Sequence, residues 1–233
     1  TLPDALALAQ TMVDIGKLAG KPVVAVITSM AQPLGTHIGN ALEVKDAIDV
    51  LAGRTQGDLL EISLLLGSHM LVLAEKARTL PEARAMLENA LSSGAGLRKL
   101  AEMIAAQGGD PRVVEDLSLL PQAAVKRVMQ AETAGYLSEM DTTALGMAAQ
   151  RMGAGRAKKS DMLDYSVGYV LHVRLGDEVT EDTPLATLYA RNEAEAEEAE
   201  KAIRKALTIA RKKPQTPKLW DAVVTAEGIT YNR

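Results

Sequence analysis

Residues 33–46, PLGTHIGNALEVKD, join a short loop bounded by glycines to a helix that carries two carboxylates. We expect the loop from Leu34 to Gly39 to leave backbone carbonyls without partners, while Glu43 and Asp46 project from one side of the helix. Carbonyl and carboxylate oxygens together suit a hard cation. A simpler interpretation is that Glu43 caps the helix and Asp46 is solvated, because acidic first turns are common. The residues alone favour the simpler interpretation and leave the cation site open.

Other residues that could do chemistry give weaker signals. The histidines are His37, His69 and His172, and none belongs to an HExxH zinc motif; a GxSxG nucleophile turn is also absent. We expect His69 to be partly buried among apolar neighbours and satisfied by a hydrogen bond. Gly153-Ala154-Gly155-Arg156 resembles a glycine pair that binds phosphate beside an arginine. Without a preceding strand and further glycines, a turn with a surface arginine is the better interpretation.

The composition excludes several classes of protein. The 233 residues are 47% hydrophobic and 24% charged, which is ordinary for a globular chain. A net charge of -4 gives no basic field, so neither nucleic acid nor a membrane surface is an expected partner. The absence of cysteine excludes disulfides and thiolate metal sites. With no membrane-spanning or signal segment visible, we expect a cytoplasmic protein.

Apolar periodicity predicts a helix-rich first half. Residues 23–27, VVAVI, read as a strand buried on both faces of an α/β sheet. A capping box of Asn40 and Glu43 is expected to start the next helix, which Gly53 closes. The further predicted helices span residues 3–18, 58–77 and one or two segments within 81–106.

From about residue 131 the sequence changes to short, glycine-punctuated segments typical of β structure. Two helices are expected within it, at 144–152 and 193–210, the second acidic at its start and basic at its end. The fold class predicted is therefore α/β, a helix-flanked mixed sheet followed by a small α+β domain. We place the domains at 1–120 and 121–233, with a soft boundary near 115–130.

Several long motifs resemble one family in the same order along the chain. They are PLGTHIGNALEVKDAI from Pro33, LGSHMLVLAEKA at 66–77, AQGGDPRVVED at 106–116, GAGRAKKSDMLDYSVG at 153–168 and VLHVRLGDEVTEDTPLATLYA at 170–190. Together they are similar to bacterial pyrimidine-nucleoside phosphorylases of the thymidine phosphorylase family. The LGSHM and AEKA segments resemble the broad-specificity bacterial enzymes more than the strict thymidine phosphorylases.

The resemblance implies a homodimeric pentosyltransferase of nucleoside salvage. Such an enzyme uses inorganic phosphate to cleave uridine, thymidine or deoxyuridine to the free base and a pentose 1-phosphate. Phosphate itself attacks the sugar, so the protein contributes orientation and electrostatic stabilisation. The β-rich region is similar to a barrel-sandwich of the biotinyl type.

The resemblance also implies a monovalent cation, potassium, close to the phosphate. The matching ligands are the backbone carbonyls of Leu34 and His37 and the carboxylate of Asp46. The family usually has glutamate where Asp46 stands, so the shorter side chain could bind through a water. A cation there would stiffen the phosphate loop and offset the charge of the substrate.

The resemblance further implies that the phosphate-binding loop and the residues that hold the base precede this chain. Together with an opening Thr1 in place of methionine, it suggests a C-terminal fragment that is inactive alone, with no catalytic or substrate-binding residue in this span. The alternatives are a non-catalytic scaffold and a biotinyl or lipoyl carrier module. A carrier needs a lysine at a hairpin tip, and the turn at 140–143, MDTT, has none.

Overall fold

The computed structural model describes residues 1–232. It consists of two compact units, each built from segments that are not contiguous in the sequence. Unit 1 comprises residues 1–29, 56–93 and 217–232, and unit 2 comprises residues 30–55 and 94–216. These units interleave along the chain, and the predicted domain boundary near residue 120 stays a prediction. Both units combine helices with strands, so the coarse α/β class is confirmed.

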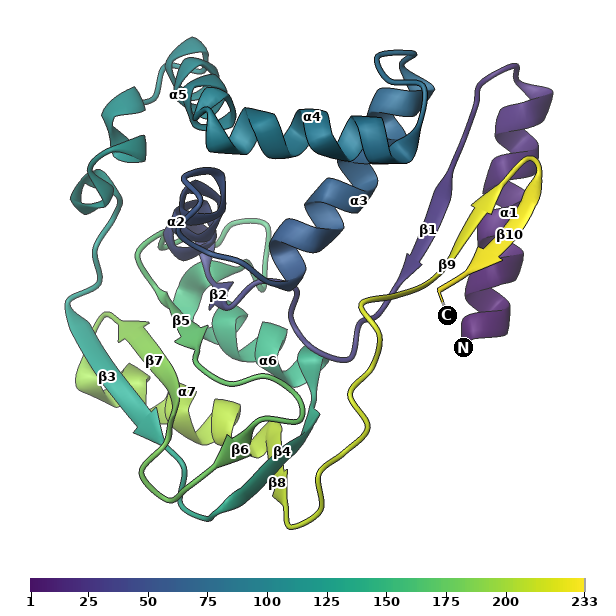
Figure 1. The fold of residues 1–233 in the computed structure, drawn as a ribbon. Helices are drawn as coiled ribbons and strands as arrows, with labels where there is room; N and C mark the ends of the chain where they lie inside the picture. The colour runs from purple at the N-terminus through teal and green to yellow at the C-terminus, as the bar shows by residue number, and fades with distance from the viewer. Residues whose placement is uncertain (233) are drawn as a thin grey trace. The chain divides into compact units, whose positions relative to one another are not determined.

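Unit 1 contains an antiparallel sheet covered by one helix. The strands are β1 (Ala25–Thr28), β9 (Trp220–Thr225) and β10 (Gly228–Tyr231), in the order β1-β9-β10. Helix α1 (Leu2–Leu18) packs Ala9 and Val13 against Val224 of the central strand. Figure 1 shows α1 beside the strands from both ends of the chain. Strand β1 is thus an edge strand of half-buried residues, and the expected strand buried on both faces was wrong here.

Two further helices of unit 1 pack on each other. They are α3 (Asp58–Leu73) and α4 (Leu80–Ser92), and Arg84 of α4 binds Glu61 of α3 through two hydrogen bonds of 3.0 Å. Thr79 starts α4, because its hydroxyl accepts the amide of Glu82. Helix α3 was predicted to extend to about residue 77, but it ends at Leu73.

Unit 2 holds the larger core, formed by two antiparallel sheets and the helices on them. One sheet has the order β2-β5-β7-β3, and the other β6-β4-β8. Their strands are β2 (His37–Ile38), β3 (Val125–Gln130), β4 (Gly135–Met140), β5 (Gly168–Leu171), β6 (Glu178–Val179), β7 (Pro184–Ala190) and β8 (Leu207–Ala210). All pairings among residues 1–232 are antiparallel, so the mixed sheet expected from the sequence is absent from the described residues.

The helices of unit 2 lie mostly where the sequence pattern predicted them. They are α2 (Asn40–Leu51), α5 (Ala95–Ala106), α6 (Thr142–Ala149) and α7 (Glu193–Lys205), with a π turn at Gln150–Ala154 and 3-10 turns at Pro111–Val114 and Leu117–Leu119. The prediction of helix up to residue 210 was wrong, because residues 207–210 pair with β4 as strand β8. Of the one or two helices expected within 81–106, the structure has two, α4 and α5, separated at Gly94.

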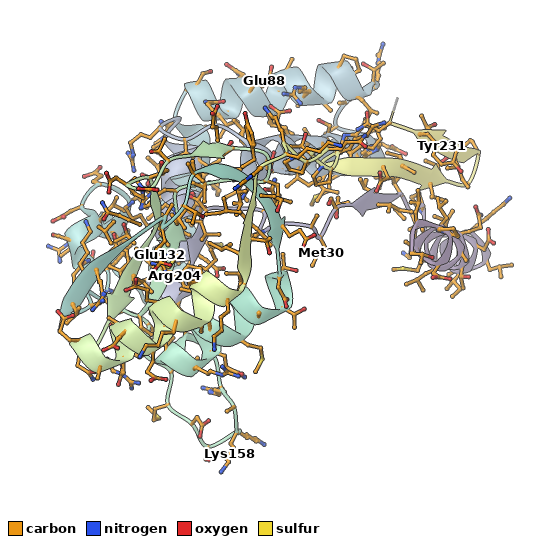
Figure 2. The ribbon with its side chains drawn as sticks, turned by 90° about the horizontal axis from the view of Figure 1, so that it is seen from below. Met30, Glu88, Glu132, Lys158, Arg204 and Tyr231 are labelled. Carbon is orange, nitrogen blue, oxygen red and sulfur yellow. The ribbon has the colours of Figure 1, made fainter. Side chains whose placement is uncertain are left out.

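Helix α7 is joined to β3 and the loop after it by ion pairs. Glu200 accepts hydrogen bonds from Arg127 at 2.8 Å and from Arg204 at 2.9 Å. Arg204 also lies 3.3 Å from Glu132, and the two side chains meet in Figure 2. Glu200 in the middle of α7 and Arg204 in its last turn are therefore bound to β3 and the loop after it.

Candidate functional site

The loop at residues 33–39 belongs to unit 2 and leads directly into α2. Its final residue, Gly39, has a φ of 137° and caps the helix from outside. Glu43 accepts a hydrogen bond from the Gly39 amide at 3.2 Å. Asn40 is the first helical residue, and its side chain donates to the carbonyl of Ala154 at 2.8 Å. The capping interaction of Glu43 is therefore present, but shifted by one residue from the expected Asn40 box.

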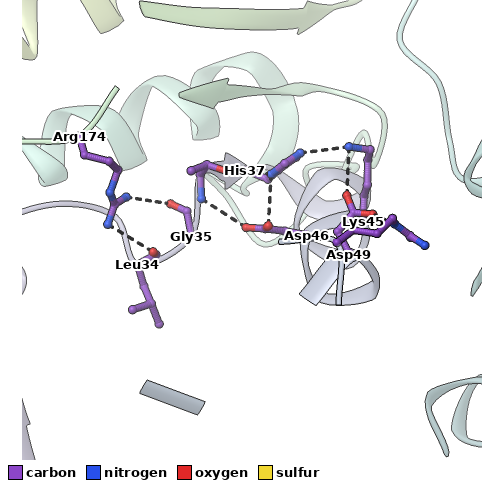
Figure 3. A network of polar contacts seen from close by, with 9 residues as sticks. Leu34, Gly35, His37, Lys45, Asp46, Asp49 and Arg174 are labelled. Carbon is purple, nitrogen blue, oxygen red and sulfur yellow. Dashed lines mark hydrogen bonds and ion pairs between the residues drawn. The ribbon is translucent and has the colours of Figure 1, made fainter. Parts of the chain in front are cut away.

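Asp46 is buried inside unit 2, with 3% of the residue exposed. Its carboxylate accepts the amide of Thr36 at 3.3 Å and lies 3.5 Å from Nδ1 of His37 (Figure 3). A solvated Asp46, the simpler interpretation of the sequence, was therefore wrong. Burying a carboxylate is costly unless positive groups or hydrogen bonds compensate it, so this side chain has a specific structural or ligand-binding role.

The His37 imidazole bridges Asp46 to a second group of charges. Burial lowers the pKa of His37, and the negative charge of Asp46 offsets part of that effect. The Lys45 ammonium lies 3.3 Å from Nε2, and Nδ1 lies 3.0 Å from the Thr36 hydroxyl. Because the ammonium can only donate, these contacts fit a neutral imidazole with its proton on Nδ1.

Lys45 extends this network to the surface of α2. Its ammonium also pairs with Asp49 at 3.4 Å, and Asp49 accepts a 2.7 Å hydrogen bond from Arg54. Burial alone would raise the pKa of Asp49, but Arg54 and Lys45 bring it below the usual value. Lys45 thus faces both His37 and Asp49, and Arg54 also faces Asp49, whereas the contacts of Asp46 are the Thr36 amide and the neutral imidazole.

The carbonyls of residues 33–36 have partners, contrary to the expectation from the sequence. Arg174 follows β5 and donates to the carbonyl of Pro33 at 2.6 Å. At longer range it donates to the carbonyls of Leu34 and Gly35 (Figure 3). The next carbonyl, Thr36, accepts the amide of Leu171 at 2.8 Å. The end of β5 and Arg174 after it therefore hold residues 33–36.

Two glycines bring the loop and β5 unusually close. A Cβ at Gly168 would lie 2.2 Å from the carbonyl oxygen of Ile38, and one at Gly39 would lie 2.5 Å from that of Val167. The register places His37 opposite Val170 and Ile38 opposite Tyr169. Because no side chain fits between the two backbones, glycine at both positions fixes where α2 begins.

The candidate ligand atoms at this site are oxygens, which hard cations prefer and soft transition metals do not. Among the described residues no group of three or more His, Cys, Asp or Glu side chains could hold a metal ion. The contacts of Asp46 with Thr36 and His37 are longer than full-strength charge-assisted hydrogen bonds, which leaves its buried charge only weakly compensated. One carboxylate with backbone carbonyls is the oxygen donor set of a hard, weakly held cation.

The other residues singled out in the sequence are His69, Arg156 and the turn at 140–143. His69 is half-buried on α3 as expected, but its Nε2 atom is buried with no hydrogen-bond partner among the described residues, so the expected satisfied histidine was wrong. Arg156 is exposed and donates to the Asp161 carbonyl, as in the turn interpretation; the same loop carries Lys158 in Figure 2. The turn at 140–143 is a helix start, where Asp141 caps α6.

Two family models match the chain. One, described as a glycosyl transferase family a/b domain, covers residues 2–97, and the other, the pyrimidine nucleoside phosphorylase C-terminal domain, covers residues 136–210. The pyrimidine-nucleoside phosphorylase of Geobacillus stearothermophilus is 50% identical over 192 residues, which is 82% of this chain and 44% of that protein. The chain belongs to the pyrimidine-nucleoside phosphorylase family.

Other phosphorylases of the family match similarly. The one from Bacillus subtilis (strain 168) is 50% identical over 83% of this chain and 45% of its own length, and the one from Staphylococcus aureus (strain USA300) is 45% identical over 90% and 48%. The chain therefore spans about half the length of these relatives. Within residues 1–232, no helix has the length and apolar character needed to cross a membrane.

The sequence named Leu34, His37 and Asp46 as cation ligands, which stays a prediction, and it singled out neither Arg174 nor Lys45. The structure brings Asp46 and the His37 side chain together in one network and shows the Leu34 carbonyl facing Arg174. Lys45 could have been found, because it shares the helix face of Asp49 at a spacing of four residues. Arg174 gave no signal, since it is distant from the loop in the sequence.

Proposed function

We propose that this chain is the C-terminal portion of a pyrimidine-nucleoside phosphorylase that acts in nucleoside salvage. The observation that carries the proposal is 50% identity to the Geobacillus enzyme over 82% of the chain, together with matches to two family models. Uridine, thymidine and deoxyuridine are the proposed substrates, with inorganic phosphate as co-substrate.

In the proposed reaction a phosphate oxygen attacks the anomeric carbon of the sugar. The glycosidic carbon–nitrogen bond breaks, and the base leaves with the electron pair and takes up a proton. The products are the free base and a pentose 1-phosphate. No protein nucleophile is needed, so the enzyme acts by orienting the two substrates and by stabilising charge.

Within this chain, the loop at 33–39 is the proposed contribution to the site. Potassium would be held by the Leu34 and His37 carbonyls and the Asp46 carboxylate, and would offset the negative charge of phosphate nearby. The support is chemical: Asp46 is buried beside the loop, and its contacts with Thr36 and His37 are long. Direct binding by Asp46 or binding through one water both remain within this proposal.

A second observation supports a role within a larger polypeptide. Helix α1 packs one apolar side on the sheet of unit 1, yet Leu8, Met12 and Ile15 on another side are 63%, 55% and 60% exposed. A helix that is apolar on two sides is usually buried on both. We therefore propose that the phosphate loop and base-binding residues lie in the part of the relatives that this chain does not span, and that the full enzyme is a homodimer.

We propose that the β-rich half of the chain is a scaffold of the biotinyl type that carries no prosthetic group. The start of α6 at Asp141 leaves no hairpin tip at 140–143 to present a lysine, which weighs against a carrier module. A non-catalytic scaffold is the remaining alternative.

The test measures uracil release from uridine and phosphate. Two proteins are compared, the 233-residue chain and the same chain fused to the part of the Geobacillus relative that it does not span. We expect release by the fusion alone, and faster release in potassium than in tetramethylammonium. If the fusion is folded and releases no uracil, the proposed activity is wrong and the scaffold alternative leads.

The cation is tested on the same fusion with substitutions of one carboxylate. Asp46→Asn removes the charge and should abolish the difference between potassium and tetramethylammonium, whereas Asp46→Glu should retain it. The matched control is Asp14→Asn on the exposed side of α1, which should behave as the parent. A potassium effect that survives Asp46→Asn would place the cation elsewhere.

A further inference from the structure

The Arg174 side chain contacts the backbone carbonyls at the start of the loop. Its guanidinium donates through Nη1 to the Pro33 carbonyl at 2.6 Å and to the Gly35 carbonyl at 3.5 Å, and through Nη2 to the Leu34 carbonyl at 3.4 Å. Three successive carbonyls thus point toward one planar group. A planar fork of donors can hold several acceptors in a fixed arrangement, which a single ammonium cannot do.

The backbone of Arg174 is itself held in place. Its amide donates to the Asp177 carboxylate at 2.8 Å, and its carbonyl accepts the Asp177 amide at 3.1 Å. The turn continues with Gly176, whose amide donates to the carbonyl of Leu137, a fully buried residue of β4. The neighbouring Leu175 amide donates to the side chain of Gln32, just before the loop. The guanidinium therefore extends from a rigid turn.

The loop that Arg174 holds is also the loop that contacts Asp46. The Thr36 amide points at the Asp46 carboxylate, while the carbonyls of Leu34 and Gly35 point at the guanidinium (Figure 3). The Pro33 carbonyl binds the same guanidinium. The loop is therefore fixed by a positive group on one side and a negative group on the other. The bond to Pro33 is short, whereas the contact with Leu34 is long, so the Leu34 oxygen keeps a lone pair for a second partner.

We propose that Arg174 is a positioning residue that holds residues 33–36 beside Asp46 and thereby sets the affinity of the cation site. The inference rests on the proposed function for the cation itself. It does not require Arg174 to touch nucleoside or phosphate. Arg174 affects cation binding in two opposite ways. By holding the carbonyls in place it should strengthen binding, whereas repulsion between its positive charge and the cation should weaken binding. Removing Arg174 therefore distinguishes the two effects by the direction of the change.

The first measurement is independent of activity. Amide hydrogen exchange of residues 34–39 is recorded without potassium for the parent chain, Arg174→Met and Arg174→Lys. Because the loop loses its fork of donors in both variants, we expect roughly tenfold faster exchange in each. The control is Arg191→Met, which removes an exposed arginine paired with Glu195 and should leave exchange in the loop unchanged. Unchanged exchange in Arg174→Met would overturn the inference.

The second measurement is potassium binding by calorimetry at constant ionic strength, with tetramethylammonium as the replacement ion. We expect the apparent dissociation constant to rise roughly tenfold in Arg174→Met. Tighter binding in that variant would show that repulsion dominates and would overturn the inference, as would full retention of affinity by Arg174→Lys. Absence of potassium binding by the parent chain would instead refute the cation site, while uracil release by the fusion tests the phosphorylase activity separately.

Discussion

Gly168→Ala should strongly destabilise unit 2, because the new Cβ would overlap the backbone of the loop before α2. It would lie 2.2 Å from the Ile38 carbonyl oxygen and 3.0 Å from Cα of Gly39. The φ of 149° is also strained for a residue with a side chain. Overpacking and backbone strain each cost about 1–3 kcal/mol, so we expect a loss of about 4 kcal/mol in the free energy of unfolding.

The matched control is Gly146→Ala in α6 of the same unit. A Cβ there meets no atom within 4 Å, and alanine inside a helix is about 0.5–1 kcal/mol more stable than glycine. The assay is urea denaturation followed by near-ultraviolet circular dichroism of the tyrosines, with Trp220 fluorescence reporting unit 1. If the free energies of unfolding of the two variants differ by less than about 1 kcal/mol, the close approach of the loop and β5 does not exclude a side chain at residue 168.

Two further substitutions test individual hydrogen bonds. Tyr169→Phe removes a buried hydroxyl that donates to the Leu145 carbonyl at 2.8 Å, and should cost about 1 kcal/mol near neutral pH by urea denaturation. Burial raises the pKa of Tyr169, so its contribution is present below the unfolded pKa of about 10 and is lost as the pH rises further. The phenylalanine variant should lack this alkaline loss, and an identical pH profile would contradict the assignment. Thr79→Ala removes the cap of α4 and should cost about 1 kcal/mol by far-ultraviolet circular dichroism, whereas Thr79→Ser should retain most of the stability; equal losses would exclude capping.

Local sequence patterns predicted the helices well where one element determines its own boundaries. Apolar spacing and a glycine located α1 and α2, and the acidic start of α7 located its first turn. The end of α7 was missed because Leu207 to Ala210 follow an alanine- and lysine-rich run that reads as helix. These residues leave the helix to pair with β4, a tertiary interaction that local propensity does not contain.

The site could be predicted only as far as short-range chemistry reaches. The sequence identified Asp46 as a possible ligand but could not distinguish a solvated carboxylate from a buried one, because burial depends on β5 and the residues after it. It also predicted unpaired loop carbonyls, whereas Arg174 occupies them. Pairing of β1 with β9 was invisible for the same reason, since the two strands come from opposite ends of the chain.

The strand order of the unit 1 sheet affects how the chain folds during its synthesis on the ribosome. Ala25 and Val26 of β1 pair with Val224 and Val223 of β9, which the ribosome adds much later, after all the strands of unit 2. Until then β1 has no partner strand, and its apolar residues and free backbone edge are open to other chains. Unit 2 has all of its strands by Ala210 and can complete its sheets first. Premature termination just before Pro217 would therefore spare the strands of unit 2 but leave β1 permanently without its sheet.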